Sequence, residues 1–278
     1  MFKFNGEDVF KVYLKQEQLQ LARKDLMDVL CMTPFWIYLG LAEIRWQYKR
    51  SVLGPLWITI SMSIFIGAIG IVYSKLFQQC ISSYFPFLVS GILTWTFISS
   101  LITESTNLFK EAKTYITQMK TPYLLQAFKL VFRHLIVFAH NFVVYLVVML
   151  IFHKNPFWKF FIFIPGLFLV TLNMLWISVF IGMTGARYQD FTQIVRSLIT
   201  VAFFVSPITW QLKQLHQHLL VFLLNPFYYF LDLVRSPLIG IPPQISSWTF
   251  GIVFLLIGSA ITFLFFTKHR RNIAFWIS

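Results

Sequence analysis

Six long apolar stretches constrain the fold of this chain more than any other feature. They cover roughly residues 55–74, 85–103, 130–152, 160–184, 193–212 and 247–267. A helix needs about 20 mostly apolar residues to cross the hydrocarbon core of a bilayer, which is about 30 Å thick. Of all residues, 58% are hydrophobic and 12% are charged, so a soluble core could not bury the apolar surface. The sequence therefore predicts an all-α integral membrane protein with six transmembrane helices.

The distribution of Lys and Arg predicts the orientation of these helices. If the N-terminus is cytoplasmic, 18 of the 23 Lys and Arg residues lie in inner segments and five in outer ones. Cytoplasmic loops of membrane proteins carry such an excess of cations. This explains the net charge of +13 without nucleic acid as a partner. Since the number of spans is even, we expect both termini in the cytoplasm.

Two segments without a full span precede the first transmembrane helix. Residues 1–33 are charged throughout and lack the apolar run of a signal peptide, so we predict a cytoplasmic helical segment. Residues 34–50 begin apolar and end basic, with Trp and Tyr side chains that suit the headgroup layer. We predict an amphipathic helix in the inner interface, and the alternative is a seventh, shorter span. Residues 51–278 would then form the six-span domain.

The two longest connections differ in character. The inner connection, 104–121, is polar and is followed by Pro122, so we expect a short helix near 106–119 and then a break. The outer connection, 214–246, contains the apolar string NPFYYFLDLVRSPLIG at 225–240. An apolar segment too short to span fits a re-entrant or interfacial hairpin. Its Asp232 and Arg235 are three residues apart and would pair on one helix face.

Signatures of catalysis and of metal binding are missing from the sequence. It contains no G-x-x-x-x-G-K-[ST] phosphate loop, no paired carboxylates beside a histidine, and no acid at the middle of a span. His216 and His218 are two residues apart and would point to different helix faces, so we predict no metal site. His134 and His140 fit buried, hydrogen-bonded histidines better than a proton relay. The chain is predicted to be no enzyme, to bind no cofactor, and to depend on a partner for energy.

Four segments, in order along the chain, carry a resemblance to a known family. They are RWQYKRSVLGPLW (45–57), GARYQDFTQIV (185–195), FFVSPITW (203–210) and NPFYYFLDLVRSPLIG (225–240). They resemble segments of the permease subunit of type-two ABC exporters for bacterial surface polysaccharides, the O-antigen (Wzm-type) and teichoic-acid permeases. Gln189 stands where that family usually has Arg. The likeness extends from about residue 34 to the end.

The resemblance implies a function and a set of partners. The permease would form a homodimeric channel in the bacterial inner membrane, with two separate ATPase subunits that bind ATP and Mg. It would move lipid-linked polysaccharide from cytoplasm to periplasm, and the L-G-P-L-W string favours O-antigen. The alternatives are a permease for capsule, teichoic acid or a smaller lipid or drug, or a membrane glycosyl or acyl transferase.

Candidate site residues follow from this resemblance and from the charge distribution. Cations before the first span would bind a lipid diphosphate or only anchor the topology: Arg45, Lys49 and Arg50. Charged residues of the inner connection would couple to the ATPase: Glu104, Lys110, Glu111, Lys113 and Lys120. Residues of the outer hairpin would form a gate, or a lid that only seals the dimer rim: Phe227, Tyr228, Tyr229, Asp232 and Arg235. Arg187 and Asp190 would form a structural pair between spans four and five.

Overall fold

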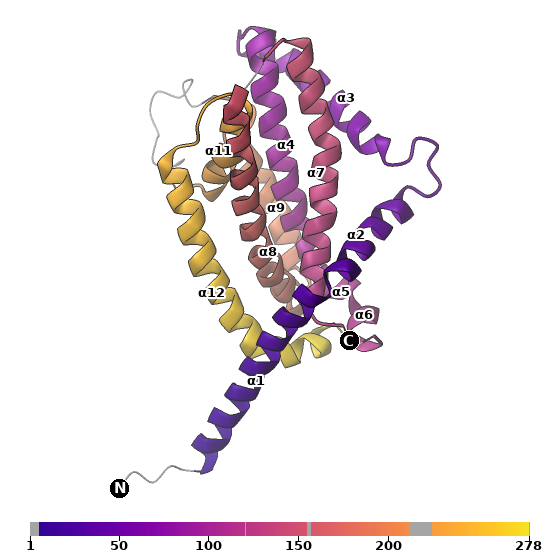
Figure 1. Ribbon diagram of the computed structural model, residues 1–278, viewed down its shortest axis with the longest axis vertical. Coiled ribbons are helices and arrows are strands. Elements are labelled where there is room, and N and C mark those ends of the chain that lie inside the picture. The colour runs from indigo at the N-terminus through magenta and orange to yellow at the C-terminus, as the bar shows by residue number, and fades with distance from the viewer. Residues whose placement is uncertain (1–5, 120, 155–156, 212–223, 278) are drawn as a thin grey trace.

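The structure is a computed structural model that describes residues 6–119, 121–154, 157–211 and 224–277. All regular elements of these described segments are helical (Figure 1). The first half contains α1 (Gly6–Cys31), α2 (Thr33–Gln47), α3 (Leu56–Leu76), α4 (Ile81–Ser105), α5 (Leu108–Glu111) and α6 (Lys113–Thr117). The second half contains α7 (Leu125–Ile151), the 3₁₀ helix η1 (Phe157–Ile162), α8 (Phe163–Arg187), α9 (Phe191–Val205), α11 (Pro226–Leu238) and α12 (Ile245–Trp276).

Five of the described helices are long and apolar enough to cross a membrane: α3, α4, α7, the unit Lys159–Arg187 formed by η1 and α8, and α12. A sixth crossing exists if Gln16–Cys31 and Thr33–Gln47, which meet at 70°, count as one broken span. The number of spans is therefore five or six by length and composition.

The prediction of a continuous fifth span over 193–212 is wrong within the described residues. Helix α9 has 15 residues, which at about 1.5 Å each is short of the bilayer core. It ends at Val205 because Pro207 disfavours a helical conformation at the preceding residue, and Ser206 is extended with φ −85° and ψ 143°. The rest of the predicted outer connection includes 212–223, which lie outside the described residues.

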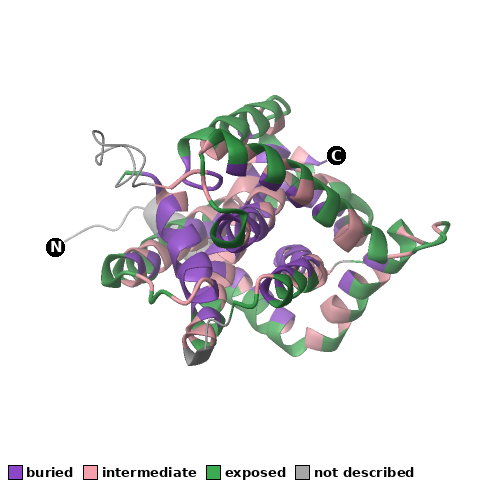
Figure 2. Cartoon of the chain, turned by 90° about the horizontal axis from the view of Figure 1, so that it is seen from above, coloured by how far each residue is buried: buried purple, intermediate pink, exposed green. Residues whose placement is uncertain are grey.

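Helix α4 is the centre of the bundle and packs against α3, α7, α8, α9 and α11. In the apolar 18-residue stretch that marks each span, 78% of the residues of α4 are buried, against 17% in α3 and 22% in α12. Seen along the bundle, buried residues gather on the inner helices and exposed residues surround them (Figure 2). The outer helices therefore present their apolar faces to lipid or to another protein.

Two glycines of α8 allow other segments to approach its backbone closely. A Cβ atom on Gly185 would lie 2.1 Å from the Thr106 carbonyl oxygen, just before α5. A Cβ atom on Gly166 would lie 2.3 Å from the Leu233 carbonyl oxygen in α11. Neither contact tolerates a side chain, so these glycines set the positions of α5 and α11 on α8.

The segments predicted to be cytoplasmic lie at the same end of the bundle. Helices α1, α5, α6 and the last turns of α12 meet at the lower end in Figure 1, while α11 lies toward the other end. The inner connection differs in detail from the prediction, because the helix expected near 106–119 is two short helices, α5 and α6, separated by Ala112.

An ion pair clamps α1 to the end of α12. The Arg270 guanidinium donates from Nε to Asp25 Oδ2 at 2.6 Å and from Nη2 to Asp25 Oδ1 at 2.8 Å. Asp25 is 4% exposed, and the Arg270 guanidinium lies 5.1 Å from the centre of the Tyr123 ring. A second pair, Arg271 Nη2 to Glu17 Oε2 at 2.8 Å, lies on the surface nearby. The charged N-terminal helix is therefore part of the folded unit.

Candidate functional site

A large cavity with polar walls lies between α2, α3, α4 and α7. Its volume is about 1240 Å³. Its walls combine aromatic side chains with charged and amide groups, among them Tyr38, Glu43, Trp46, Tyr48, Trp57, Ser61, Phe65, Thr96, Ser100, Glu104, Glu111, Tyr115, Arg133, His134 and Asn141. Polar groups among transmembrane helices are rare and mark functional sites by default.

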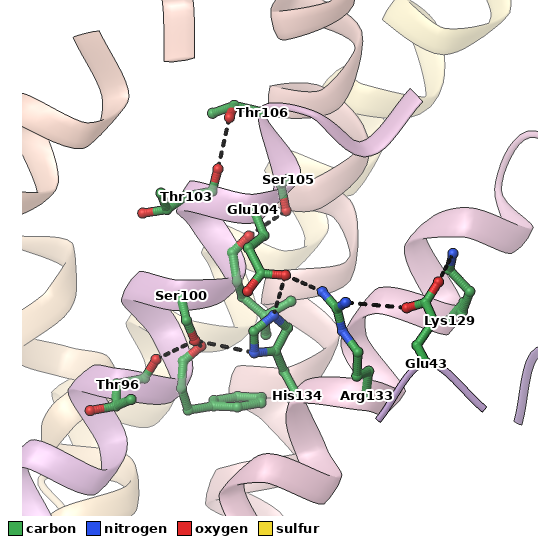
Figure 3. Close-up of polar contacts among 12 residues, drawn as sticks. Glu43, Thr96, Ser100, Thr103, Glu104, Ser105, Thr106, Lys129, Arg133 and His134 are labelled. Carbon is green, nitrogen blue, oxygen red and sulfur yellow. Dashed lines mark hydrogen bonds and ion pairs between the residues drawn. The ribbon is translucent and has the colours of Figure 1, made fainter. Parts of the chain in front are cut away.

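An ion-pair network joins three of these helices, α2, α4 and α7, in the wall of the cavity (Figure 3). Glu43 of α2 accepts from Lys129 and lies 3.2 Å from Arg133 Nη1, both on α7. Arg133 also donates to Glu104 at the end of α4. Lys129 and Arg133 are four residues apart and share one face of α7, so one carboxylate can meet both. The network fixes α2 to the bundle.

His134 extends this network along α4, from Glu104 to Ser100. It is 5% exposed; its Nδ1 lies 3.1 Å from Ser100 Oγ, and its Nε2 lies 3.3 Å from Glu104 Oε2 (Figure 3). The prediction of a buried, hydrogen-bonded histidine is therefore confirmed for His134. His140 is half-buried, and its Nδ1 lies 2.9 Å from the Ile136 carbonyl oxygen.

Asn141 is a third polar residue of α7 in the cavity wall, after Arg133 and His134. It is 4% exposed, and its Oδ1 has no hydrogen-bond partner among the described residues. Leaving a buried acceptor unpaired costs roughly 1–3 kcal/mol. Asn141 thus has an unused acceptor in the wall of the cavity.

Sequence reasoning did not assign Glu43, Lys129, Arg133 or Asn141 to a site. One signal was available, because Glu43 is one of only ten acids and directly follows the apolar run at 34–42. Its partners, however, are 86 and 90 residues away along the chain, and only packing brings them together.

The three cations predicted to bind a lipid diphosphate lie beside this cavity but outside its wall. Arg45 is in the last turn of α2, and Lys49 and Arg50 follow in the turn toward α3. All three are exposed, and Lys49 Nζ lies 5.8 Å from the Trp46 ring centre. Gly54, with φ +57°, lies in the turn just before α3, in a conformation that favours glycine.

The coupling candidates of the inner connection have different environments. Helices α5 and α6 are held by buried apolar side chains, and Lys113 is exposed on α6. Glu104 is turned into the ion-pair network. Glu111 faces the cavity, where partial burial and the Glu104 charge raise its pKa. Lys120 lies outside the described residues.

The gate candidates lie on α11, which is a buried helix. Asn225 caps its start by accepting from the Phe227 backbone N–H at 3.0 Å. Tyr228 and Tyr229 are 8% and 9% exposed, so their rings face protein. The segment is short, apolar and buried as predicted, and a sharp return at Gly240 (φ +81°) leads into α12.

The predicted pair of Asp232 and Arg235 is wrong, because each residue has better partners elsewhere. The Asp232 carboxylate accepts from Ser236 Oγ at 2.5 Å, Ser247 Oγ at 2.6 Å and the Gln244 backbone N–H at 2.9 Å. Arg235, 7% exposed, is held by two contacts with other segments. Its Nη1 donates to the Pro207 carbonyl at 2.5 Å, and its guanidinium lies 4.6 Å from the Phe87 ring centre. Together the two residues tie α11 to α12, to the end of α9 and to α4.

The predicted pair of Arg187 and Asp190 is also not formed. The Arg187 guanidinium instead lies 5.1 Å from the Tyr188 ring centre and 5.6 Å from that of Trp276. Cation–π contacts of this kind contribute about 0.5–1 kcal/mol at exposed sites. They link the end of α8 to the end of α12.

A bundle of long apolar helices with a polar cavity, charged helices at one end and a buried short helix toward the other describes a multi-pass membrane permease. Residues 35–239 match the family described as "ABC-2 type transporter", and the chain belongs to that family. The chain is 22% identical over 208 residues to the "O-antigen export system permease protein RfbA" of Myxococcus xanthus, and the alignment covers 74% of each chain. It is therefore the membrane component of a type-two ABC transporter and not itself an enzyme.

Proposed function

We propose that the chain is the transmembrane subunit of an ATP-driven exporter that moves lipid-linked polysaccharide, with O-antigen as the first candidate, from the cytoplasm to the periplasm. The observation that carries the proposal is the alignment with an O-antigen export permease over 74% of both chains. The four sequence segments that resemble polysaccharide permeases support the same substrate class. Capsule, teichoic acid and smaller amphiphiles are the alternative substrates of such a permease.

The proposed assembly contains two copies of this chain and two separate ATPase subunits, which bind ATP and Mg. Helices α3 and α9 support the pairing of two copies, because they expose apolar rows to the outside of the bundle. These rows include Ile64, Ile71 and Val72 on α3, and Ile194, Leu198, Val201 and Phe204 on α9. Lipid would cover whatever part of these rows the second copy leaves free.

The ATPase subunits would dock on α5 and α6. These short helices are anchored by Leu108, Phe109 and Ile116, which are 6%, 0% and 7% exposed. A short element that is fixed to the bundle and exposes charges at its end can transmit movement to the helices. At the other end, α11 would close the channel at rest.

Deletion of the gene in its host tests the proposal. We expect loss of the surface glycan and accumulation of lipid-linked polymer in the cytoplasm, both reversed by the intact gene. Normal surface glycan without accumulation would contradict the substrate class. The glycan that accumulates identifies O-antigen, capsule or teichoic acid.

The orientation has a separate test. A reporter that is active only in the cytoplasm, fused after residue 278, should be active, because both termini are expected inside the inner membrane. A periplasmic signal would contradict the orientation and leave the substrate class unaffected.

A further inference from the structure

We propose that the cavity between α2, α3, α4 and α7 binds a neutral, hydroxyl-rich sugar ring next to the diphosphate of the transported lipid. The inference rests on the proposed function and deepens it, because it assigns a sugar site to one protomer.

Two polar ladders line this cavity. Thr96, Ser100 and Glu104 recur every four residues on α4, so they share one helix face. His134 and Asn141 are seven residues apart on α7, two turns on the same face. Donors and acceptors are thus placed along the cavity wall, where a polyol can form hydrogen bonds with both helices.

The charge of the cavity disfavours a phosphate and favours a neutral ligand. Among the described lining residues, three carboxylates, Glu43, Glu104 and Glu111, are accompanied by one permanent cation, Arg133, and Lys129, outside the lining, pairs with Glu43. Arg133 already contacts both Glu43 and Glu104. A diphosphate would add negative charge to this site, whereas a sugar hydroxyl can donate to its carboxylates.

The cations that suit a diphosphate lie just outside the cavity. Arg45 and Arg50 are exposed and have no ion-pair partner among the described residues. They are adjacent in sequence to the lining residues Trp46, Gln47 and Tyr48. A substrate with its diphosphate at these cations would have its first sugar at the cavity.

Two aromatic side chains and one unpaired acceptor, Asn141 Oδ1, also suit a sugar ligand. Trp46 and Trp57, from either side of the bend between α2 and α3, both line the cavity and are 77% and 44% exposed. Their faces can stack on the apolar C–H face of a sugar ring. Asn141 Oδ1 is unpaired and buried, which is the state of a group whose partner is a ligand.

The size of the cavity fits one or a few rings. Small-ligand sites have volumes of about 300–1,000 Å³, and this cavity is slightly larger. A sugar ring with its bound water therefore has room while the lipid tail stays in the bilayer.

Binding of two lipid probes to the complete complex without ATP tests the assignment. One probe is a bare polyprenyl diphosphate, and the other is the same lipid with one glucose, galactose or N-acetylglucosamine residue. We expect at least one sugar to lower Kd about tenfold in the unmutated complex, the ratio that one or two buried hydrogen bonds produce. If no sugar lowers Kd, the inference is overturned. If neither probe binds at all, the proposed substrate class fails as well.

Asn141→Leu should remove most of the tenfold gain in affinity that the sugar gives, while Kd for the bare lipid stays unchanged. Arg50→Ala is the matched control, since it should weaken both probes by the same factor and leave their ratio intact. The Tm of unliganded Asn141→Leu should equal or exceed that of the unmutated protein, because Oδ1 has no partner to lose. The assignment is overturned if Asn141→Leu leaves the ratio of the two Kd values unchanged. It is also overturned if the substitution lowers Tm by several degrees, which would show that Asn141 has a structural role.

Discussion

The clamp between Asp25 and Arg270 should respond asymmetrically to removal of either partner. Arg270→Met keeps the length of the side chain but leaves the Asp25 carboxylate, 4% exposed, without its counter-charge. Breaking a buried pair in this way costs about 3–5 kcal/mol. Asp25→Asn instead leaves an arginine that is 19% exposed and still lies over Tyr123. The loss is then that of a charged hydrogen bond, about 1.5–3 kcal/mol.

Hydrogen exchange of the α1 backbone amides between residues 16 and 31 measures these energies, since α1 packs on the bundle mainly through α12. At about 1.4 kcal/mol per tenfold, Arg270→Met should accelerate exchange by roughly 10²- to 4 × 10³-fold. The expected acceleration for Asp25→Asn is about 10- to 100-fold. The double variant Asp25→Leu/Arg270→Met should exchange more slowly than Arg270→Met alone, because no buried charge remains.

The surface pair of Glu17 and Arg271 provides the control on the same two helices. Its side chains are 44% and 43% exposed, so Glu17→Ala should change exchange by less than about fivefold. The reasoning is refuted if Asp25→Asn exchanges faster than Arg270→Met, or if the double variant is no slower than Arg270→Met.

Three further predictions follow from the packing and the site. Gly185→Ala should lower Tm by an amount equivalent to about 1–3 kcal/mol, because its Cβ would meet the Thr106 carbonyl. Gly67→Ala is the control: a Cβ there has nothing within 4 Å, so Tm should stay unchanged or rise. Equal effects of the two substitutions would contradict the packing at Gly185. Arg235→Ala should lower stability by about 1.5–3 kcal/mol and impair export while the assembled complex persists, measured by Tm and surface glycan, and normal export would argue against a gate on α11. Lys113→Glu should weaken copurification of the ATPase or reduce export per ATP hydrolysed, because Lys113 is exposed on α6. Lys110→Glu, at a half-buried position of α5, should act mainly on stability. If Lys113→Glu leaves association and transport unchanged, α6 is not part of the proposed docking surface.

Much of the helical layout could be predicted from the sequence because membrane helices are specified locally. Apolar length alone located α3, α4, α7, α8 and α12 to within several residues. The start of α11 follows a local rule too, since Pro226 is its first residue, whereas Pro237 lies inside the last turn. The rule that proline disfavours a helical residue before it, applied to Pro207, would have shortened the fifth span.

The polar site could not be predicted in this way because its contacts depend on packing. Spacing of three residues suggested that Asp232 pairs with Arg235, yet Asp232 accepts from Ser236 on its own helix and from Gln244 and Ser247 at the start of α12. Likewise, Glu43 lies on α2 and Glu104 on α4, and only the packing of these helices against α7 places both beside Arg133. Helical periodicity describes neighbours on one helix and carries no information about which helix lies opposite.

The clamp between α1 and α12 also has a consequence for biogenesis. Its two residues are 245 positions apart, so at about 5–20 residues per second the ribosome makes Arg270 roughly 10–50 s after Asp25. Throughout that time the Asp25 carboxylate has no partner, and α1 has no surface on which to settle. Docking of α1 is thus expected to be among the last steps of folding, and a nascent chain stalled before residue 270 should leave α1 open to protease. Protection of α1, the first helix to be synthesised, from protease would then indicate that α12, the last helix, has been inserted.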